Sequence, residues 1–254
     1  MPIRRFIDGK RQSAKKEATE IGIRTATAAD LKIITSWLKE ELDRSGAKKG
    51  FYDNINLIEE GQATGELVVA ADKRDNSPIA FYLGRGHSAA ILEVRPDYRQ
   101  KGIGRLLMEH IIKCAKNKGF FGISGFCSPK ESLPFWLKMG FEQVHNPNQT
   151  HEVAYPIRRR NKLPLNCKLY DITFKLYEND ESIEPRKTQI ISAAMSGQKY
   201  ELEEDFVEYV YDYNALLIIE VAGRELYKDS IKYIDDIGGE RVEPWLRVNK
   251  IQIR

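Results

Sequence analysis

One short run near the middle of the chain constrains its fold more than any other feature. It reads as a strand, a glycine-containing turn and a helix in direct succession. Residues 89–94 are apolar and a proline follows two positions later, which indicates a buried strand. Apolar residues then recur at helical spacing over residues 103–115, and Gly119 supplies a stop signal. Gly102 and Gly104 therefore border the first turn of a predicted helix.

The N-terminus of that helix is predicted to bind an anion. The N–H groups of a first helical turn are free, and the helix dipole favours negative charge there. Gly102 and Gly104 let a phosphate approach the backbone closely, and Arg99, Lys101 and Arg105 add positive charge. The pattern is neither a P-loop nor a dinucleotide fingerprint, because it has no Gly-Lys-Ser/Thr ending and no third glycine at the required position.

The full string resembles the diphosphate-binding loop of the GNAT superfamily of acyl-CoA N-acyltransferases. That loop reads Arg/Gln-x-x-Gly-x-Gly/Ala, which Arg99, Gly102 and Gly104 match, after a Val-x-Pro that begins at Val94. A second block also fits, because an apolar strand at 120–126 precedes a short helix that closes on Gly-Phe at residues 140 and 141.

The resemblance covers residues 20–157 and implies an α/β (α+β) fold, with a mixed central sheet flanked by helices. We therefore expect a basic N-terminal arm over 1–19, a GNAT-like acyl-CoA-binding domain over 20–160, and a smaller β-rich domain over 161–254. Thr27 or Asp30 is expected to cap the first helix of the GNAT-like domain.

The C-terminal domain resembles no family that we recognise, and its role stays open. Strands are expected at 169–177, 200–213, 215–221 and 245–253, and a short helix at 229–237. Eight of the twelve tyrosines lie in this part of the chain. They predict either a recognition surface or, more often, the aromatic core of a small β-rich domain.

Charge is distributed unevenly between the two halves. Residues 1–160 hold 27 basic and 19 acidic side chains, a balance of +8, whereas residues 161–254 hold 13 and 18, a balance of −5. The basic half suits a polyanionic co-substrate, and the acidic half is open to a basic protein partner. The only dense basic run, residues 158–160, lies at the expected domain boundary, where such runs are usually solvated linkers. Because no aromatic residues interleave this run, a nucleic-acid partner is disfavoured.

Other classes of protein are excluded by what the sequence lacks. Its three cysteines have no C-x-x-C spacing, which argues against a disulfide framework and a zinc site, so no metal is expected. No apolar run approaches the length of a membrane span, and the basic N-terminus has no apolar signal region. A cytoplasmic protein that does not enter the membrane is expected.

The resemblance also implies how acetyl-CoA, or another acyl-CoA, would bind. The backbone of Leu92 to Val94 would hydrogen-bond the pantetheine arm, and the Val94 N–H would polarise the thioester carbonyl. The diphosphate would be held by seven consecutive residues: Arg99, Gln100, Lys101, Gly102, Ile103, Gly104 and Arg105.

Two residues are candidates for catalysis by the same resemblance. Glu93 lies beside the expected thioester and is the candidate base that removes a proton from the attacking amine; the alternative is a salt bridge to Arg95 or Arg105. Trp136 stands where many relatives have a tyrosine that is proposed as the general acid. An indole N–H donates a hydrogen bond but does not usefully release its proton, so Trp136 is expected to stabilise the thiolate or pack on the pantetheine.

Three functions remain open at this stage. The first is an acetyl-CoA-dependent N-acetyltransferase that acts on a primary amine by direct attack on the thioester. The second is a non-catalytic acyl-CoA-binding or protein-interaction module, and the third is acylation of an amine attached to a nucleic acid. The enzyme is favoured, and the amine acceptor, a small molecule or a protein, is not specified by the sequence.

Overall fold

The computed structural model describes residues 20–45, 51–85, 88–144, 151–179 and 182–253. The expected basic arm, residues 1–19, lies outside the described residues. The described chain falls into two compact units, of which the first runs to Gln143 and includes 151–153, and the second includes Ala154–Arg254. No helix among the described residues is long and apolar enough to cross a membrane.

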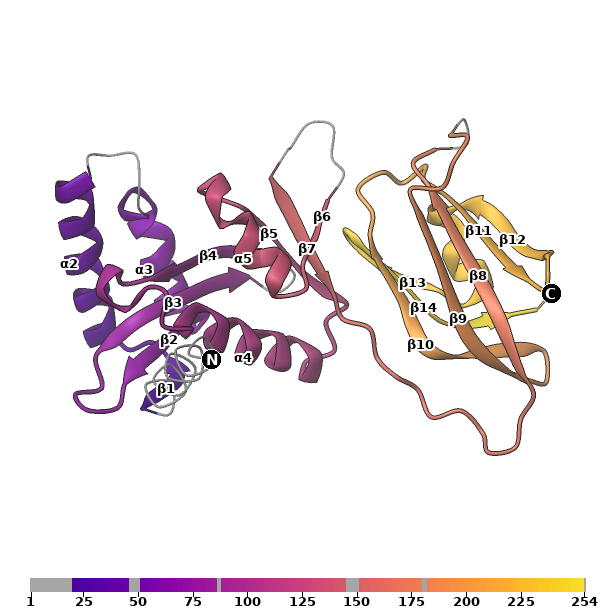
Figure 1. Ribbon diagram of the computed structural model, residues 1–254, viewed down its shortest axis with the longest axis horizontal. Helices are drawn as coiled ribbons and strands as arrows, with labels where there is room; N and C mark the ends of the chain where they lie inside the picture. The colour runs from indigo at the N-terminus through magenta and orange to yellow at the C-terminus, as the bar shows by residue number, and fades with distance from the viewer. Residues whose placement is uncertain (1–19, 46–50, 86–87, 145–150, 180–181, 254) are drawn as a thin grey trace, which may run out of the picture. The chain divides into compact units, whose positions relative to one another are not determined.

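The first sheet has seven strands in the order β1-β2-β3-β4-β5-β7-β6 (Figure 1). The elements around it are, in chain order, β1 (Ile21–Thr25), α2 (Ala28–Ser45), η1 (Tyr52–Asn54), α3 (Ile55–Ala63), β2 (Leu67–Asp72), β3 (Pro78–Arg85), β4 (Ser88–Val94), η2 (Pro96–Tyr98), α4 (Ile103–Asn117), β5 (Gly122–Phe126), η3 (Lys130–Ser132), α5 (Leu133–Lys138), β6 (Glu142–Gln143) and β7 (Glu152–Pro156). The pairs β1–β2, β2–β3 and β3–β4 are antiparallel, whereas β4–β5 is parallel, so the predicted mixed sheet is confirmed.

Helices cover both faces of this sheet. On one face α2 and α3 pack in a cluster whose sheet residues include Val69, Phe81 and Ile91. On the other face Gly104 of α4 lies beside Val94, since a Cβ built on this glycine would be 3.5 Å from Val94 Cγ2. Side chains alternate along a strand, so consecutive residues of β4 face different helices.

The start of α2 shows how the sequence determines local structure. The Asp30 carboxylate accepts a hydrogen bond from the Thr27 N–H at 2.7 Å, and the Asp30 N–H donates to Thr27 Oγ1 at 3.3 Å. This reciprocal pair is a capping box, and the expected cap is confirmed. Arg24 of β1 reaches the same carboxylate at 2.5 Å and ties the helix to the sheet.

The parallel pairing of β4 with β5 is short. Among the described residues it consists of Ser88 with Ser124 and Ala89 with Gly125. On its other side β4 contains a bulge, because β3 and β4 shift register between the pairs Leu83–Ile91 and Gly84–Ala89. From residue 90 to 94, therefore, the β5 side of β4 has no ladder partner in β5, and we call this stretch the open edge of β4.

The second unit contains another seven-stranded sheet, with the order β12-β11-β8-β9-β10-β14-β13. Its elements are β8 (Leu169–Tyr177), β9 (Lys187–Ser196), β10 (Lys199–Tyr209), β11 (Leu216–Val221), β12 (Arg224–Ser230), η4 (Ile231–Ile237), β13 (Glu240–Val242) and β14 (Trp245–Gln252). All its pairs are antiparallel, and Phe174 stacks on Phe206 in the core with ring centroids 4.4 Å apart. The predicted β-rich fold of the C-terminal part is confirmed.

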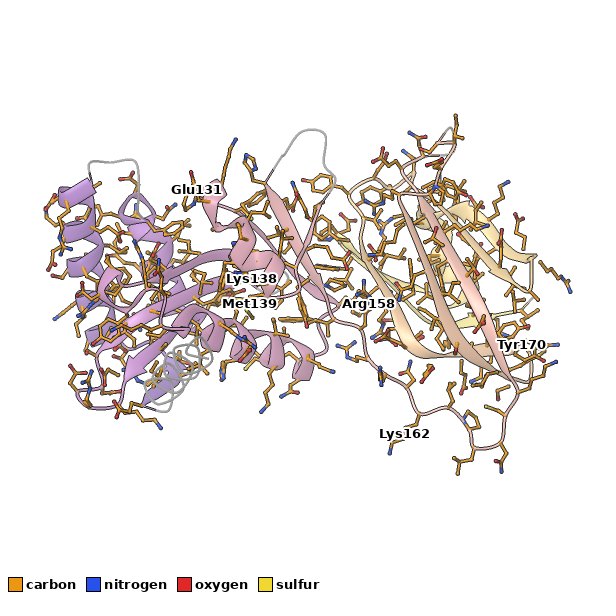
Figure 2. All side chains as sticks on the ribbon, viewed as in Figure 1. Glu131, Lys138, Met139, Arg158, Lys162 and Tyr170 are labelled. Carbon is orange, nitrogen blue, oxygen red and sulfur yellow. The ribbon has the colours of Figure 1, made fainter. Side chains whose placement is uncertain are left out.

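The basic run at 158–160 is not a solvated linker. Arg158 pairs with Glu208 of β10 at 3.3 Å, and Arg159 lies 3.9 Å from Asp205 on the same strand. Both acidic side chains are almost fully buried, and the segment that bears Arg158 leads onward to β8 (Figure 2). The positive charge of these two arginines is therefore used inside the second unit, which corrects our expectation for this run.

Asp72, at the end of β2, makes the stability of the first unit depend on pH. Arg74 and Tyr98 hydrogen-bond to its carboxylate, Arg74 Nε at 2.9 Å and the Tyr98 hydroxyl at 3.5 Å. These bonds, mainly those of Arg74, lower the pKa of Asp72 to about 2. The carboxyl pKa of an unfolded aspartate is about 3.9. The stabilisation is therefore present above about pH 4 and is lost as the pH falls towards 2.

We expect the melting temperature of Asp72→Asn to lie below that of the wild type at neutral pH, and the difference to shrink between about pH 4 and pH 2. Thermal unfolding followed by circular dichroism across this range measures the effect. Asp53→Asn, at an exposed position of η1, serves as the control. A difference between Asp72→Asn and the wild type that does not change with pH would contradict this account.

Candidate functional site

The N-terminus of α4 is open, as expected for an anion site. Gly102 occupies the N-cap position with φ of 83°, and no side chain caps the helix there. A Cβ at Gly102 would meet nothing within 4 Å, so space lies directly in front of the first turn. Gln100 also has a positive φ, 62°, which turns the backbone into the loop. The N–H groups that a first helical turn leaves without intrahelical partners, together with this space, fit a phosphate.

Two of the three predicted cations lie around this turn. The Lys101 ammonium lies 5.1 Å from the centre of the Tyr98 ring. Arg105, on the first turn of α4, is 72% exposed and pairs with Glu109 at 2.7 Å. Because a surface ion pair of this kind is weak, Arg105 is available to an anion.

Arg99, the third predicted cation, points into the protein. Its Nη2 atom donates to Glu93 Oε1 at 2.9 Å and to Glu41 Oε1 at 2.6 Å. Its Nε atom donates to the carbonyl oxygen of Val94 at 2.9 Å. In this structure the guanidinium therefore joins α2, β4 and the loop that follows β4 through its Nε and Nη2 atoms.

Glu93 places its carboxylate at the open edge of β4. The Arg95 N–H donates to Ile79 of β3 at 2.9 Å, so the preceding N–H, that of Val94, points to the other side of the strand. There the Val94 N–H donates to Glu93 Oε1 at 3.0 Å. The candidate base and the candidate oxyanion donor are thus hydrogen-bonded to each other.

The salt-bridge partners considered for Glu93 in the sequence are wrong. Arg95 pairs with Asp97 at 3.4 Å, and Arg105 pairs with Glu109. The cation that reaches Glu93 is Arg99. The sequence left open which face of the sheet Glu93 occupies. It pairs with Phe81 of β3, and therefore faces α2.

Burial gives Glu93 an unusual proton affinity. Desolvation raises the pKa of the Glu93 carboxyl, and the negative charge of Glu41 adds to the rise. Arg99 and the Val94 N–H oppose this change without cancelling it. A carboxylate with a raised pKa is better suited to accept a proton near neutral pH.

Glu41 is a site residue that the sequence analysis missed. Its side chain is only 11% exposed, although a glutamate usually lies in solvent. A signal was present, because Glu41 follows Ile34 and Leu38 at helical spacing on the buried stripe of α2. A carboxylate at a core-facing helix position requires a partner, and Arg99 is that partner.

Trp136 lies in α5, within a cluster of aromatic side chains. The ring is 7% exposed and packs edge-on against Phe135 and Phe141, at 5.2 and 4.9 Å between ring centres. Gly104 lies beside Phe135, so this cluster borders the first turn of α4. The arrangement makes Trp136 part of the support of that turn.

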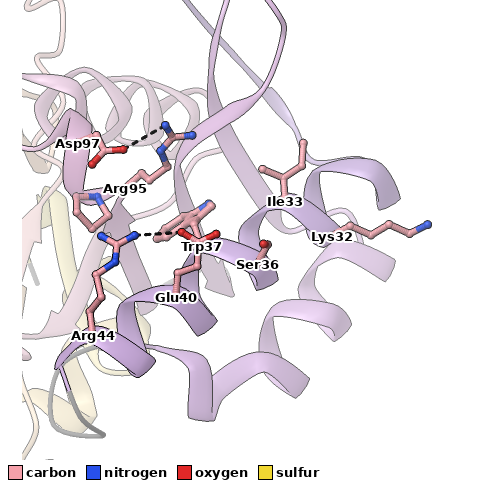
Figure 3. A pocket seen from close by; sticks show the side chains of 9 residues that line it. Lys32, Ile33, Ser36, Trp37, Glu40, Arg44, Arg95 and Asp97 are labelled. Atoms are coloured by element: carbon pink, nitrogen blue, oxygen red, sulfur yellow. Dashed lines mark hydrogen bonds and ion pairs between the residues drawn. The ribbon is translucent and has the colours of Figure 1, made fainter.

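A cleft of about 440 Å³ lies between α2 and the residues after β4 (Figure 3). Four of its five charged side chains are paired with one another, Arg44 with Glu40 at 3.1 Å and Arg95 with Asp97 at 3.4 Å. Its lining residues are Lys32, Ile33, Ser36, Trp37, Glu40, Arg44, Arg95, Pro96 and Asp97. The cleft includes neither Glu93 nor Gly102, and we do not place the reaction there.

Comparison with known proteins finds similarity to acetyltransferases. Residues 58–143 match the family model of the acetyltransferase (GNAT) domain, which spans α3 to β6 and includes the whole of loop 99–105. A tRNA(Met) cytidine acetyltransferase of Saccharolobus solfataricus is 34% identical over 76 residues. That alignment covers 29% of this chain and about a tenth of the length of the curated relative.

Solved structures with a similar fold include a GNAT-family acetyltransferase of Staphylococcus aureus, at 14% identity and a TM-score of 0.44, covering 54% of this chain and 98% of that one. Another is the PaiA N-acetyltransferase of Thermoplasma acidophilum in complex with coenzyme A, at 19% identity and a TM-score of 0.43, covering 54% and 99%. The first part of the chain contains a GNAT acetyltransferase domain, matched over residues 58–143.

Proposed function

We propose that this protein is an N-acetyltransferase that transfers an acetyl group from acetyl-CoA to a primary amine. The observation that carries the proposal is the position of the Glu93 carboxylate, at the open edge of β4 and bonded to the Val94 N–H. The family match and the coenzyme A held by the Thermoplasma relative support the choice of co-substrate.

Loop 99–105 fits the diphosphate of acetyl-CoA. In this proposal the free N–H groups at the start of α4 donate hydrogen bonds to the phosphate oxygens, and Lys101 and Arg105 neutralise the phosphate charge. The backbone of Leu92, which lacks a β5 partner at this point, is available to the pantetheine arm. The N–H and carbonyl groups of Val94 would join it once the Glu93 and Arg99 side chains release them. Acetyl-CoA supplies the activated acetyl group.

The residues of this chain then have to move protons. The neutral amine attacks the thioester carbonyl carbon, a C–N bond forms, and the C–S bond breaks to release coenzyme A thiolate. Glu93 takes the proton that the amine nitrogen loses and later releases it to solvent, and the thiolate takes up one proton from solvent as it leaves, so the products are an amide and a thiol and the enzyme is unchanged. Once the Glu93 carboxylate has turned towards the amine, the Val94 N–H donates a hydrogen bond to the thioester carbonyl oxygen.

Amine-dependent release of free thiol tests the proposal. Purified protein is incubated with acetyl-CoA and a panel of primary amines, with and without each amine, and thiol is followed by absorbance. Thiol that forms only when an amine is present is the expected result. Binding of acetyl-CoA without thiol release in any mixture would instead support a non-catalytic acyl-CoA-binding module.

Trp136 has a supporting role in this proposal and gives no proton to the thiolate. Trp136→Phe should keep the pH dependence of thiol release and lose less than about 1.5 kcal/mol of stability, because the edge-to-face contacts remain. Trp136→Ala should lose about 3–5 kcal/mol. Loss of the basic limb of the pH–rate profile in Trp136→Phe would contradict this role.

An amine in RNA is a second candidate acceptor, favoured by the similarity to the tRNA(Met) cytidine acetyltransferase. The arginines at 158 and 159 offer it little support, since both pair with buried carboxylates. Incubation with labelled acetyl-CoA and tRNA decides the matter: label in the tRNA supports this acceptor, and label only in small amines or proteins excludes it.

We propose that the second unit selects the acceptor or binds a protein partner. A reducing cytoplasm, suited to the three free cysteines, is the proposed compartment.

A further inference from the structure

Glu41, Arg99 and Glu93 form a bridge that joins three separate segments of the first unit. Glu41 comes from α2, Glu93 from β4, and Arg99 from the loop after η2. One guanidinium nitrogen serves both carboxylates, at 2.6 Å to Glu41 and 2.9 Å to Glu93. Neither carboxylate is more than 15% exposed, whereas the Arg99 side chain is 43% exposed, so solvent screens the two carboxylates less than the guanidinium.

We propose that Glu41 is a positioning residue for the acetyl transfer: it shares Arg99 with Glu93, so that this cation neither neutralises the Glu93 carboxylate alone nor turns towards loop 99–105. This inference rests on the proposed function of Glu93. Glu41 acts through Arg99 and does not touch the reacting atoms.

The charge balance of the bridge explains why sharing Arg99 helps Glu93 to accept a proton. With both carboxylates ionised the bridge has a net charge of −1, because two negative groups share one positive group. Taking up one proton brings it to zero, which is favourable in a buried site. A base that must accept a proton from an ammonium group or an attacking amine benefits from this excess negative charge.

Glu41 and Arg99 are the charged groups that act on Glu93. From α2 the charged group that acts on Glu93 is Glu41, and from the loop it is Arg99. The residue paired with it on β3 is the uncharged Phe81. Helix α4 lies on the opposite face, beside Val94. The pKa of Glu93 is raised by burial and by Glu41, in the direction that this balance requires.

Two substitutions test the bridge because they should act in opposite directions. Glu41→Gln leaves Arg99 to Glu93 alone, which should lower the titration midpoint of the Glu93 carboxyl by about one pH unit or more. Arg99→Gln removes the cation and should raise that midpoint. The acid limb of the pH profile of kcat/KM should move with the midpoint in each variant. A merely structural role would lower activity without these opposite shifts.

Carbon-13 NMR titration of the glutamate carboxyls in the ligand-free protein measures the midpoint without any need for activity. Glu40→Gln is the matched control, since Glu40 is the neighbouring residue on α2, is exposed, and pairs with Arg44. It should leave the Glu93 midpoint unchanged. A Glu93 midpoint that is unchanged in Glu41→Gln, or that shifts in the same direction in both bridge variants, would overturn the inference. Thiol release by the wild type decides the proposed function separately.

Discussion

Gly102→Trp is expected to weaken acetyl-CoA binding by at least about 100-fold. The indole would fill the space in front of α4 and cover the N–H groups that we assign to the diphosphate. Loss of two hydrogen bonds to a charged group, each worth about 1.5–3 kcal/mol, accounts for a factor of this size. Isothermal titration calorimetry with acetyl-CoA measures it directly.

Gly119→Trp is the matched control for this variant. Gly119 lies just beyond the other end of α4, has φ of 84°, and likewise has nothing within 4 Å of a built Cβ. Both substitutions place a tryptophan in the left-handed region, at a cost of about 1–2 kcal/mol each. Equal losses of affinity in both variants would show that strain, and not the blocked turn, is responsible, and would contradict the assignment of loop 99–105.

Glu93→Gln is expected to lower the rate of amine-dependent thiol release by about 10²- to 10⁴-fold, the usual contribution of a general base. An amide keeps the shape of the side chain and can still accept the hydrogen bond from the Val94 N–H. It cannot take up the proton of the amine. Acetyl-CoA affinity should therefore change little, and the loss should appear in kcat.

The acid limb of the pH–rate profile should also disappear in Glu93→Gln, because the group that titrates is gone. Glu59→Gln, at an exposed position of α3, controls for the loss of one carboxylate. A rate within a few-fold of the wild type in Glu93→Gln would mean that another group or solvent removes the proton. The role of Glu93 would then be limited to the bridge with Arg99.

Much of the fold could be predicted because its local signals agree with one another. The capping box at Thr27, the apolar stripe of α2 and the glycine after α4 each mark an element that the structure contains. Strand β9 was missed, since Ala193, Ala194 and the serines beside them have no apolar alternation. That strand is specified by its pairing with β8 and β10, which is a property of the whole sheet.

The candidate site shows the same division between local and distant information. Loop 99–105 is contiguous, so its glycines and cations could be identified from their spacing alone. The orientation of Arg99 could not, because it depends on Glu41, which lies 58 residues earlier in the chain. The partner of Glu93 was misassigned although Arg99 is only six residues away, because the direction of the Arg99 side chain is set together with Glu41.

Calorimetric comparison of acetyl-CoA with S-acetylpantetheine tests the central claim most directly. Both compounds present the same thioester and pantetheine arm to β4, but only acetyl-CoA has the diphosphate and the adenosine 3′-phosphate attached to it. If the N-terminus of α4 binds that diphosphate, acetyl-CoA should bind with micromolar affinity and S-acetylpantetheine at least about 100-fold more weakly. Equal affinities, or no binding of acetyl-CoA, would contradict the assignment of loop 99–105 as the acyl-CoA site.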